Sequence, residues 1–418
     1  MELNSKLAEK RLNMYIDRAI EKVVIKALSM FKVILITGPR QVGKTTLLKN
    51  ILGADYEYIT LDDISELDMA KNDAKLFFLT HPGKIVIDEV QNAPEIFREI
   101  KRIVDARDDY GTIVLTGSQA FSLMKNVAET MAGRVCILEM NGLSMREIVR
   151  DSFDLPVIFT EKYLGRKPHK VDVSKLWKVI HRGDLPELYQ NPDMDWSLYY
   201  ASYIATYIDR DARMIINIKE LANFSVFMIA LAARTSQLLN YQAMATEVGV
   251  DIHTIKSWVR ILETSGIIAI VQPFSNNKLS RAIKTPRVYF MNTGLACYLL
   301  KWNTPETLMN GAMSGQILET YVVSEIIKSF KNTGIINAPI CFYRDRDQKE
   351  IDLIVESNGI LYPIEIKRVA TPKAAMIKNA TLLEKAQGFK VGTKMIMCLV
   401  DKKMYLATDV IAYPITEI

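Results

Sequence analysis

A phosphate-binding loop is the clearest chemical feature of the sequence. One stretch fits the pattern G-x-x-x-x-G-K-[ST], and it consists of Gly38, Pro39, Arg40, Gln41, Val42, Gly43, Lys44 and Thr45, followed by Thr46. The stretch lies between an apolar run at 33–36 and a helical continuation at 46–51, which is the context that the motif requires. Such a loop turns backbone N–H groups toward a polyphosphate at a helix N-terminus. A strand-to-helix turn that binds nothing is the alternative; the complete motif favours a nucleoside triphosphate.

Two acids at the end of a second strand suit hydrolysis of that nucleotide. The segment 84–89 is a β-branched apolar strand that ends in Asp88 and Glu89. In this arrangement Lys44 reaches the β- and γ-phosphates, and Thr45 and Asp88 hold Mg²⁺. Glu89 then polarises the attacking water. A solvated acidic turn is the alternative for the two acids, but a preceding phosphate loop favours the catalytic interpretation.

Two further polar positions follow later strands. A strand at 112–115 precedes Thr116 and Ser118, and one of these hydroxyls is expected to contact the γ-phosphate or the water. Capping of the next helix by Ser118 explains that residue equally well. Arg134 opens an apolar segment at 135–138, where an arginine would stabilise charge on the γ-phosphate in cis or across a subunit interface. A surface salt bridge is the alternative for Arg134. The candidate catalytic residues are therefore Glu89, Lys44, Ser118 and Arg134.

These side chains need a sheet to position them. Apolar runs near 33, 56–61, 85, 113 and 135 alternate with helical patterns such as 95–107. That order predicts a parallel sheet with helices on both faces, and nucleotides bind at the carboxyl ends of such strands. The fold class is therefore α/β, and the five strands place an ATPase domain within residues 1–150.

The sequence resembles the prokaryotic AAA-superfamily ATPases, in which an N-terminal P-loop domain is joined to a C-terminal domain of unassigned function with a restriction-endonuclease-like core. Besides the loop, the segments that carry the resemblance are 88–91 (Asp-Glu-Val-Gln), 116–118 (Thr-Gly-Ser), 132–134 (Ala-Gly-Arg) and 181–187 (His-Arg-Gly-Asp-Leu-Pro-Glu). The resemblance covers nearly the whole chain. It implies ATP binding and Mg²⁺-dependent hydrolysis, with ATP and Mg²⁺ as cofactors, and it implies no particular biological role.

The middle of the chain is predicted to be helical and then to form a winged helix-turn-helix. Residues 151–234 carry apolar and aromatic positions at helical spacing, which is typical of a lid or connector. Residues 235–300 contain two short helices around Gly249 and then two strands, the order of a winged helix. Its expected phosphate-facing positions are His253, Lys256, Ser257, Arg260, Lys278, Arg281, Lys284 and Arg287. They favour a nucleic-acid partner, DNA rather than RNA; use of the fold for protein packing is the alternative.

The last third, residues 301–418, carries a second polar constellation. Alternation along strands at 350–356 and 361–367 places Asp352, and then Glu365 and Lys367, on the same faces of neighbouring strands, with Glu319 on the preceding helix. Asp followed by Glu-x-Lys on the next strand resembles the restriction-endonuclease superfamily. There, two or three carboxylates bind Mg²⁺ and the lysine assists the attacking water. A solvated strand face is the alternative, and retention of all four residues is compatible with cleavage without establishing it.

Composition sets the remaining limits. The chain has 418 residues, of which 49% are apolar and 24% charged, as expected for a protein of several domains. A net charge of +5 neither requires nor excludes nucleic acid. No apolar run approaches the ~18 residues of a membrane span, and residues 1–11 lack a signal-peptide core, so we expect a cytoplasmic protein with no membrane partner. Four widely spaced cysteines indicate buried thiols.

Three functions remain open at this level. The first is an ATPase that couples hydrolysis to nucleic-acid binding by its C-terminal half. The second is an ATP-gated, metal-dependent nuclease. The third is a non-catalytic switch, in which bound ATP changes the affinity for a protein or DNA partner. The motifs favour the first, and the oligomeric state stays open because Arg134 is compatible with action in cis or in trans.

Overall fold

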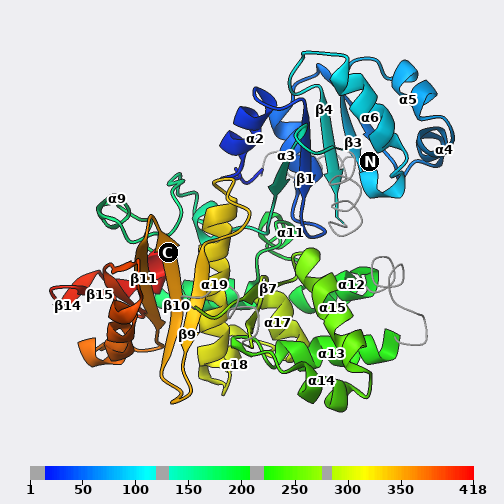
Figure 1. Cartoon of the computed structure of the whole chain (residues 1–418). Helices are drawn as coiled ribbons and strands as arrows, with labels where there is room; N and C mark the ends of the chain where they lie inside the picture. The colour runs from blue at the N-terminus through cyan, green and yellow to red at the C-terminus, as the bar shows by residue number, and fades with distance from the viewer. Residues whose placement is uncertain (1–14, 119–130, 208–220, 275–284) are drawn as a thin grey trace.

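The computed structural model describes residues 15–118, 131–207, 221–274 and 285–418. An N-terminal sheet and its helices form one lobe, at the upper right of Figure 1, and the remaining elements form a larger body below it. Among the described residues, no helix combines the length and the apolar character needed to cross a membrane. All four cysteines are free thiols; Cys297, Cys341 and Cys398 are buried and Cys136 is half-buried.

The N-terminal sheet has five parallel strands in the order β2-β3-β4-β1-β5. The strands are β1 (Val33–Thr37), β2 (Tyr56–Thr60), β3 (Lys84–Asp88), β4 (Ile113–Gly117) and β5 (Val135–Glu139). β1 and β4 are buried along their whole length, as expected for central strands that are covered on both faces. The prediction of a parallel α/β sheet at the N-terminus is confirmed.

Two apolar layers hold this sheet in place. On one face Val33 and Leu35 of β1 pack in a core with Phe97 of α6, and on the other face Ile34 packs with Leu47 of α3. The alternation follows from the two-residue period of a strand, which sends successive side chains to opposite faces. The helices of this lobe are α2 (Glu21–Leu28), α3 (Lys44–Ile51), α4 (Ile64–Asn72), α5 (Ala74–Thr80) and α6 (Ile96–Asp105).

A helical region follows the first sheet, as the sequence predicts. It leads into a small antiparallel sheet with the order β6-β8-β7, formed by β6 (Gln237–Leu238), β7 (Ile268–Val271) and β8 (Arg287–Phe290). The helices are α8 (Met145–Ile148), α9 (Glu161–Leu164), α10 (Val173–Arg182), α11 (Glu187–Gln190), α12 (Trp196–Tyr207), α13 (Leu221–Ala232), α14 (Tyr241–Val248) and α15 (Ile252–Thr264).

The elements expected between 240 and 291 are present, with one correction. α14 ends at Gly249, and α15 presents His253, Lys256, Ser257 and Arg260 at the surface. Arg287, however, is buried and does not lie on an exposed wing. Its side chain is drawn inward because two carboxylates of the C-terminal region pair with it. The other expected wing positions, Lys278, Arg281 and Lys284, lie outside the described residues.

The C-terminal region packs a mixed sheet beside a long buried helix, α19 (Ser314–Lys331), which follows α17 (Thr293–Leu299) and α18 (Pro305–Asn310). The strand order is β14-β15-β13-β11-β10-β9, and the short β12 pairs with β11. The strands are β9 (Ile340–Arg344), β10 (Glu350–Ser357), β11 (Ile360–Ile366), β12 (Lys390–Val391), β13 (Lys394–Cys398), β14 (Met404–Ala407) and β15 (Val410–Pro414).

The segment between β11 and β12 does not form a regular α-helix. It folds as 3₁₀ turns over Ala374–Lys385. Ile377 has φ −105° and ψ 22°, outside the helical region, so the turns do not join into one helix. Its buried side chains, Ile377, Ala380 and Leu383, pack against the neighbouring strands, and this packing outweighs the local helix preference.

Candidate functional site

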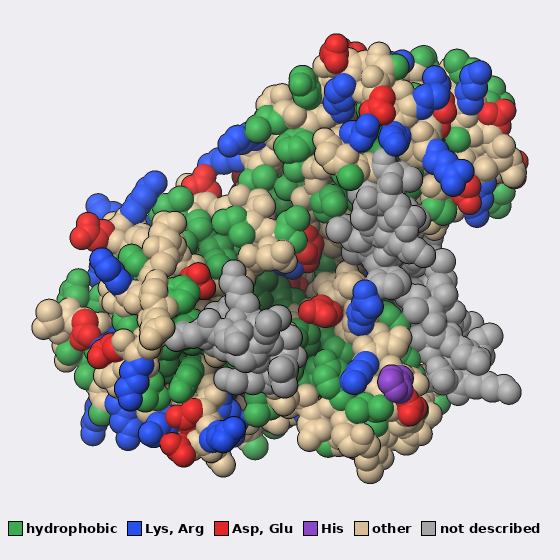
Figure 2. Space-filling view, in the orientation of Figure 1, with side chains coloured by type: hydrophobic (Ala, Val, Ile, Leu, Met, Phe, Trp, Pro, Cys, Tyr) green, Lys and Arg blue, Asp and Glu red, His purple; other side chains and the backbone are tan. Residues whose placement is uncertain are grey.

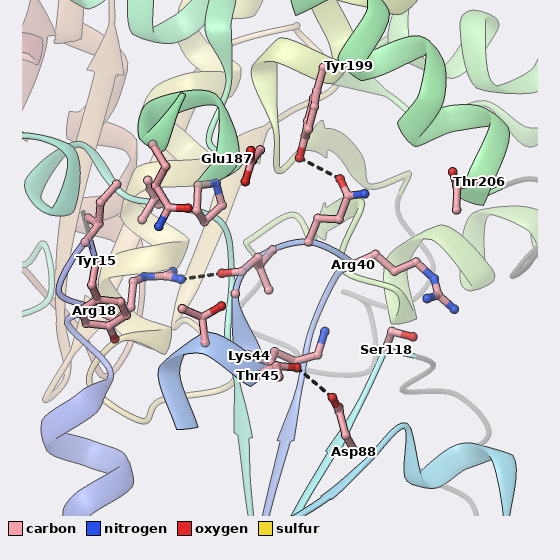
Figure 3. Close-up of a pocket in the computed structure, with 18 of the residues that line it drawn as sticks. Tyr15, Arg18, Arg40, Lys44, Thr45, Asp88, Ser118, Glu187, Tyr199 and Thr206 are labelled. Carbon is pink, nitrogen blue, oxygen red and sulfur yellow. Dashed lines mark hydrogen bonds between the residues drawn. The ribbon is translucent and has the colours of Figure 1, made fainter. Parts of the chain in front are cut away.

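A pocket of about 640 Å³ lies where the carboxyl ends of β1, β3 and β4 meet. Figure 3 shows that loop residues, Asp88 of β3 and residues of the helical region all face this pocket. Its lining residues from the predicted set are Arg40, Gln41, Val42, Gly43, Lys44, Thr45, Thr46, Asp88, Glu89 and Ser118. The position is the one that a parallel α/β sheet offers to a nucleotide.

Two glycines give the loop its shape. Gly38 has φ 140°, and a Cβ there would lie 2.0 Å from the Met140 carbonyl oxygen, so no side chain fits. Gly43 has φ 91° and directly precedes α3. Lys44 folds back over the loop and donates hydrogen bonds to the carbonyl oxygens of Gly38 (2.9 Å) and Pro39 (2.8 Å). The loop therefore has the curled form of a phosphate cradle at a helix N-terminus.

Oxygen ligands suited to Mg²⁺ meet beside the loop. The Thr45 hydroxyl donates to Asp88 Oδ2 at 2.9 Å, as Figure 3 shows. Tyr58 donates to the same oxygen at 3.2 Å, and the buried Thr116 hydroxyl donates to Asp88 Oδ1. Hydroxyl and carboxylate oxygens are hard ligands of the kind that Mg²⁺ takes alongside nucleotide phosphates. The donor set thus fits Mg²⁺, which Thr45 and Asp88 would hold.

Glu89 is fixed in an unusual conformation directly after β3. Its φ of 56° and ψ of 43° lie in the left-handed region, which costs free energy for a residue with a side chain. Gln91 donates to its carboxylate, and Ser118 donates to Oε2 at 3.3 Å. Arg40 lies 3.8 Å from Oε1. The structure therefore brings the predicted base and the predicted polar residue Ser118 together.

Arg134 lies elsewhere. It precedes β5, and its carbonyl accepts from the backbone N–H of Val33, at the amino end of β1. Its guanidinium pairs with Asp105 at the end of α6 and does not line the pocket. The pocket is at the opposite, carboxyl edge of the same strands, so a role for Arg134 in cis is not supported by this placement. Action across a subunit interface stays a prediction.

Two contacts to the loop have no motif in the sequence. The buried guanidinium of Arg18 donates to the carbonyl oxygens of Val42 (2.6 Å) and Asn141 (2.6 Å), and it pairs with Glu147 at 2.9 Å. On the other side, the Tyr199 hydroxyl of α12 donates to Gln41 Oε1 at 2.7 Å. Both residues come from outside the predicted phosphate loop, and no local pattern marks them. They tie the loop to the N-terminal segment and to the helical region.

Residues 30–149 match the sequence model of a family described as an AAA domain. This part of the chain is an AAA domain. The remainder matches two families described as domains of unknown function, DUF8612 over residues 173–306 and DUF4143 over residues 314–418. The coarse expectation of an AAA-type P-loop domain at the N-terminus is confirmed, whereas the winged helix and the restriction-endonuclease-like core stay predictions.

Similar proteins are found over most of the chain. The uncharacterized proteins Mb2031c of Mycobacterium bovis and Rv2008c of Mycobacterium tuberculosis are each 25% identical over 395 residues, covering 94% of this chain and 82% of theirs. Among solved structures, the Walker-type ATPase PABY2304 of Pyrococcus abyssi is 12% identical and covers 68% of this chain and 96% of its own, with a TM-score of 0.44. RuvB of Thermotoga maritima is 15% identical and covers 60% and 85%, with a TM-score of 0.29.

A buried ionic cluster joins the AAA domain to the rest of the molecule. Lys328 of α19 pairs with Asp184 at 2.9 Å and with Glu325 at 3.0 Å, and it donates to the Leu143 carbonyl at 3.1 Å. Glu325 in turn accepts from the backbone N–H of Met145 at 2.7 Å. Burial opposes the charge on Lys328, but the two carboxylates hold its pKa above the ordinary value. The cluster therefore links three parts of the chain through charges that water does not screen.

The second predicted constellation also comes together. Lys367 lies 3.2 Å from Asp352 Oδ2 and 2.6 Å from Glu365 Oε1, and Asp352 also accepts from the backbone N–H of Ile366 at 2.9 Å. Glu319, from α19, faces the same cluster and accepts from the Tyr289 hydroxyl at 2.9 Å. Alternation along β10 and β11 accounts for the arrangement, as the sequence predicts. The convergence of the four residues was thus predictable.

The metal-binding role expected for Glu319, Asp352, Glu365 and Lys367 stays a prediction. Within the described ranges, no group of three or more His, Cys, Asp or Glu side chains is arranged to hold a metal ion. Two cations pair with these carboxylates: Lys367 pairs with Asp352 and Glu365, and the buried Arg287 pairs with Glu319 (3.2 Å) and with Glu350. Arg287 was expected to face solvent, so its role as a counterion was missed. The carboxylates of this cluster therefore lie beside cationic side chains.

The protonation of this cluster predicts a pH dependence of stability. Burial raises the pKa of Glu319 to about 8, and Asp352 adds to the shift while Arg287 opposes it. Burial and Asp352 likewise raise the pKa of Glu365 to about 7, against Lys367. The ordinary value is 4.5, so the folded protein binds these protons more tightly than the unfolded chain does. The free energy of unfolding should therefore fall as the pH rises from about 5 to about 8.

Urea unfolding of the wild type and of Glu319→Gln at several pH values measures this effect. The amide keeps an acceptor for Tyr289 but does not titrate, so the decline in stability across this range should be smaller in the variant. Equal declines in the two proteins would show that Glu319 does not titrate in that range.

Proposed function

We propose that the chain binds ATP with Mg²⁺, hydrolyses it, and uses the cycle to control nucleic-acid binding by its C-terminal half. One observation carries the catalytic part. Lys44, Thr45, Asp88, Glu89 and Ser118 line a single pocket at the carboxyl ends of parallel strands, within an AAA domain. Positioning and electrostatic stabilisation supply most of the catalysis of phosphoryl transfer, and these side chains suit both. Bound Mg²⁺ would neutralise charge on the phosphates.

The contacts between the pocket and the rest of the molecule support coupling. Pro186 and Glu187 line the pocket, and Asp184, two residues earlier, belongs to the buried cluster with Lys328 of α19. The same helix carries Glu319 of the C-terminal cluster. A change at the nucleotide site thus has a continuous packed route to the C-terminal region. Coupling requires that the two ends prefer different arrangements in different nucleotide states.

The nucleic-acid part of the proposal rests on α15. His253, Lys256, Ser257 and Arg260 are exposed on this helix, while Ile255, Val259 and Leu262 are buried. Figure 2 shows basic side chains and a histidine on the lobe that contains α14 and α15. A helix that is anchored by one apolar face and presents cations on the other suits phosphate contacts, and DNA is the partner that the proposed winged helix favours.

Phosphate release from ATP tests the proposal directly. The wild type, Lys44→Ala and the exposed control Lys26→Ala are compared with Mg²⁺, in the presence and absence of single- and double-stranded DNA and RNA. We expect turnover by the wild type and by the control, stimulation by one nucleic acid, and loss of turnover in Lys44→Ala, because the lysine supplies the charge nearest the β- and γ-phosphates. A wild type that binds ATP but releases no phosphate under any condition would overturn the catalytic proposal and favour the non-catalytic switch.

The same reactions, followed on a gel, test the nuclease alternative. The convergence of Asp352, Glu365 and Lys367 is the observation that favours it. Cleavage that is lost in Asp352→Ala and in Lys367→Ala, with ATP turnover intact, would support it. Cleavage that survives both changes would remove it. Turnover that no nucleic acid alters, without cleavage, would direct the search to protein partners.

A further inference from the structure

We propose that Arg40 is the arginine that stabilises charge on the transferred γ-phosphoryl group, and that it acts in cis from within the phosphate loop. This inference rests on the proposed ATP hydrolysis and assigns a catalytic residue to it. The sequence assigned that charge-stabilising role to Arg134, and Arg40 was expected only to contribute to nucleotide binding.

The position of Arg40 supports the assignment. It stands between the two glycines that shape the loop, and its side chain lines the pocket together with Lys44 and Glu89. In Figure 3 the side chain extends from the loop on the same side of the pocket as Ser118, which follows β4. Its guanidinium lies 3.8 Å from Oε1 of Glu89, the residue expected to polarise the attacking water. Arg40 is therefore next to the end of the pocket where the acids place the γ-phosphate.

The other cations of the pocket have different tasks. Among the described residues that line it, the cationic side chains are Arg18, Arg40 and Lys44. Arg18 is buried and held by Val42, Asn141 and Glu147, so its role is to fix the loop. Lys44 is the motif lysine, and its point charge suits the β- and γ-phosphates. Arg40 is the cation of the pocket whose guanidinium lies beside Glu89. A planar guanidinium presents paired N–H donors whose geometry matches phosphoryl oxygens.

The chemistry places Arg40 beside a growing charge. The water oxygen forms a bond to the γ-phosphorus while the bond from that phosphorus to the β,γ-bridging oxygen breaks, and the bonding electrons leave with ADP. The proton of the water passes to Glu89, and inorganic phosphate is released. Negative charge builds on the bridging and equatorial oxygens during this step. An arginine that contacts those oxygens while it holds Glu89 aligns the base and the phosphoryl group at once.

Single-turnover and steady-state hydrolysis by Arg40→Ala, Arg40→Lys, Arg134→Ala and the exposed control Arg98→Ala test the assignment. We expect kcat to fall by at least ~10³-fold in Arg40→Ala, the range for loss of a charge-stabilising arginine. The dissociation constant of a non-hydrolysable ATP analogue should change by less than about tenfold, because the contacts that bind the ground state and the transition state equally are largely kept. Arg40→Lys should recover only part of the loss, since it keeps the charge without the fork.

A second readout separates catalysis from folding. Trapping of ADP with aluminium fluoride, which mimics the transferring group, should be lost in Arg40→Ala while analogue binding shows that the protein is folded. If the wild type hydrolyses ATP and Arg40→Ala keeps a kcat within about fivefold of the wild-type value, this inference alone is overturned. A thousandfold loss of kcat in Arg134→Ala, with Arg40→Ala still active, would also overturn it. Absence of turnover in the wild type would instead overturn the proposed function.

Discussion

Replacement of Lys328 by methionine is expected to lower the free energy of unfolding by about 3–5 kcal/mol, the usual cost of removing one partner from a buried ion pair. Methionine keeps the volume of the stem but removes the charge that Asp184 and Glu325 share, and their side chains are only 10% and 5% exposed. Two carboxylates would then be buried without a cation. Urea unfolding of the variant beside the wild type measures the change.

Two further variants make the Lys328 experiment specific. Lys178→Met changes an exposed lysine of α10 and should leave stability within about 0.5 kcal/mol of the wild type. The double variant Lys328→Met/Glu325→Gln removes one of the uncompensated carboxylates, so it should be more stable than Lys328→Met alone. A loss below about 1 kcal/mol in Lys328→Met would mean that water or protonation satisfies the carboxylates.

Replacement of Glu89 by glutamine should lower kcat for ATP hydrolysis by about 10²–10⁴-fold, the contribution of a positioned general base. The amide has the same shape, and it can still accept hydrogen bonds from Gln91 and Ser118. It cannot accept a proton from water at neutral pH. ATP binding should therefore persist, because Lys44 and the loop are untouched, and the variant should accumulate the ATP-bound form. Phosphate release and ATP-analogue binding measure the two properties.

A control variant separates the loss of the general base from the general effect of removing a negative charge. Glu95→Gln alters a carboxylate at the start of α6 that does not line the pocket, so kcat should stay near that of the wild type. If Glu89→Gln hydrolysed ATP at more than about a third of the wild-type rate, another group would have to activate the water.

The parts of the site that the sequence predicts are those encoded over short distances. The phosphate loop needs glycines at two positions that both have positive φ, so its pattern marks its backbone. Asp88 and Ser118 follow strands whose apolar composition is evident, and parallel pairing then brings them to one edge. The same logic holds for Asp352, Glu365 and Lys367, which alternate along two paired strands.

The parts that the sequence does not predict depend on contacts between distant segments. Arg18 meets Glu147 across 129 positions, and Met145 meets Glu325 across 180. A charged residue in an isolated pattern is most often exposed, so Arg287 was assigned to a wing although it is buried. Arg134 was placed near the phosphates because it opens an apolar segment, whereas its position before β5 puts it at the far edge of the sheet. Whether a charged residue is buried, and which residue it pairs with, depends on the assembled fold.

The spacing of two charged residues along α19 has a mechanical consequence. Glu319 and Lys328 are nine residues apart, which in an α-helix is about 13 Å along the axis and two and a half turns, so they project from opposite sides. Rotation of the helix about its own axis would therefore move the two charges in opposite directions. Because Glu319 lies 3.2 Å from Arg287, a rotation that displaced Lys328 from its carboxylates would also change the geometry of the Glu319–Arg287 pair.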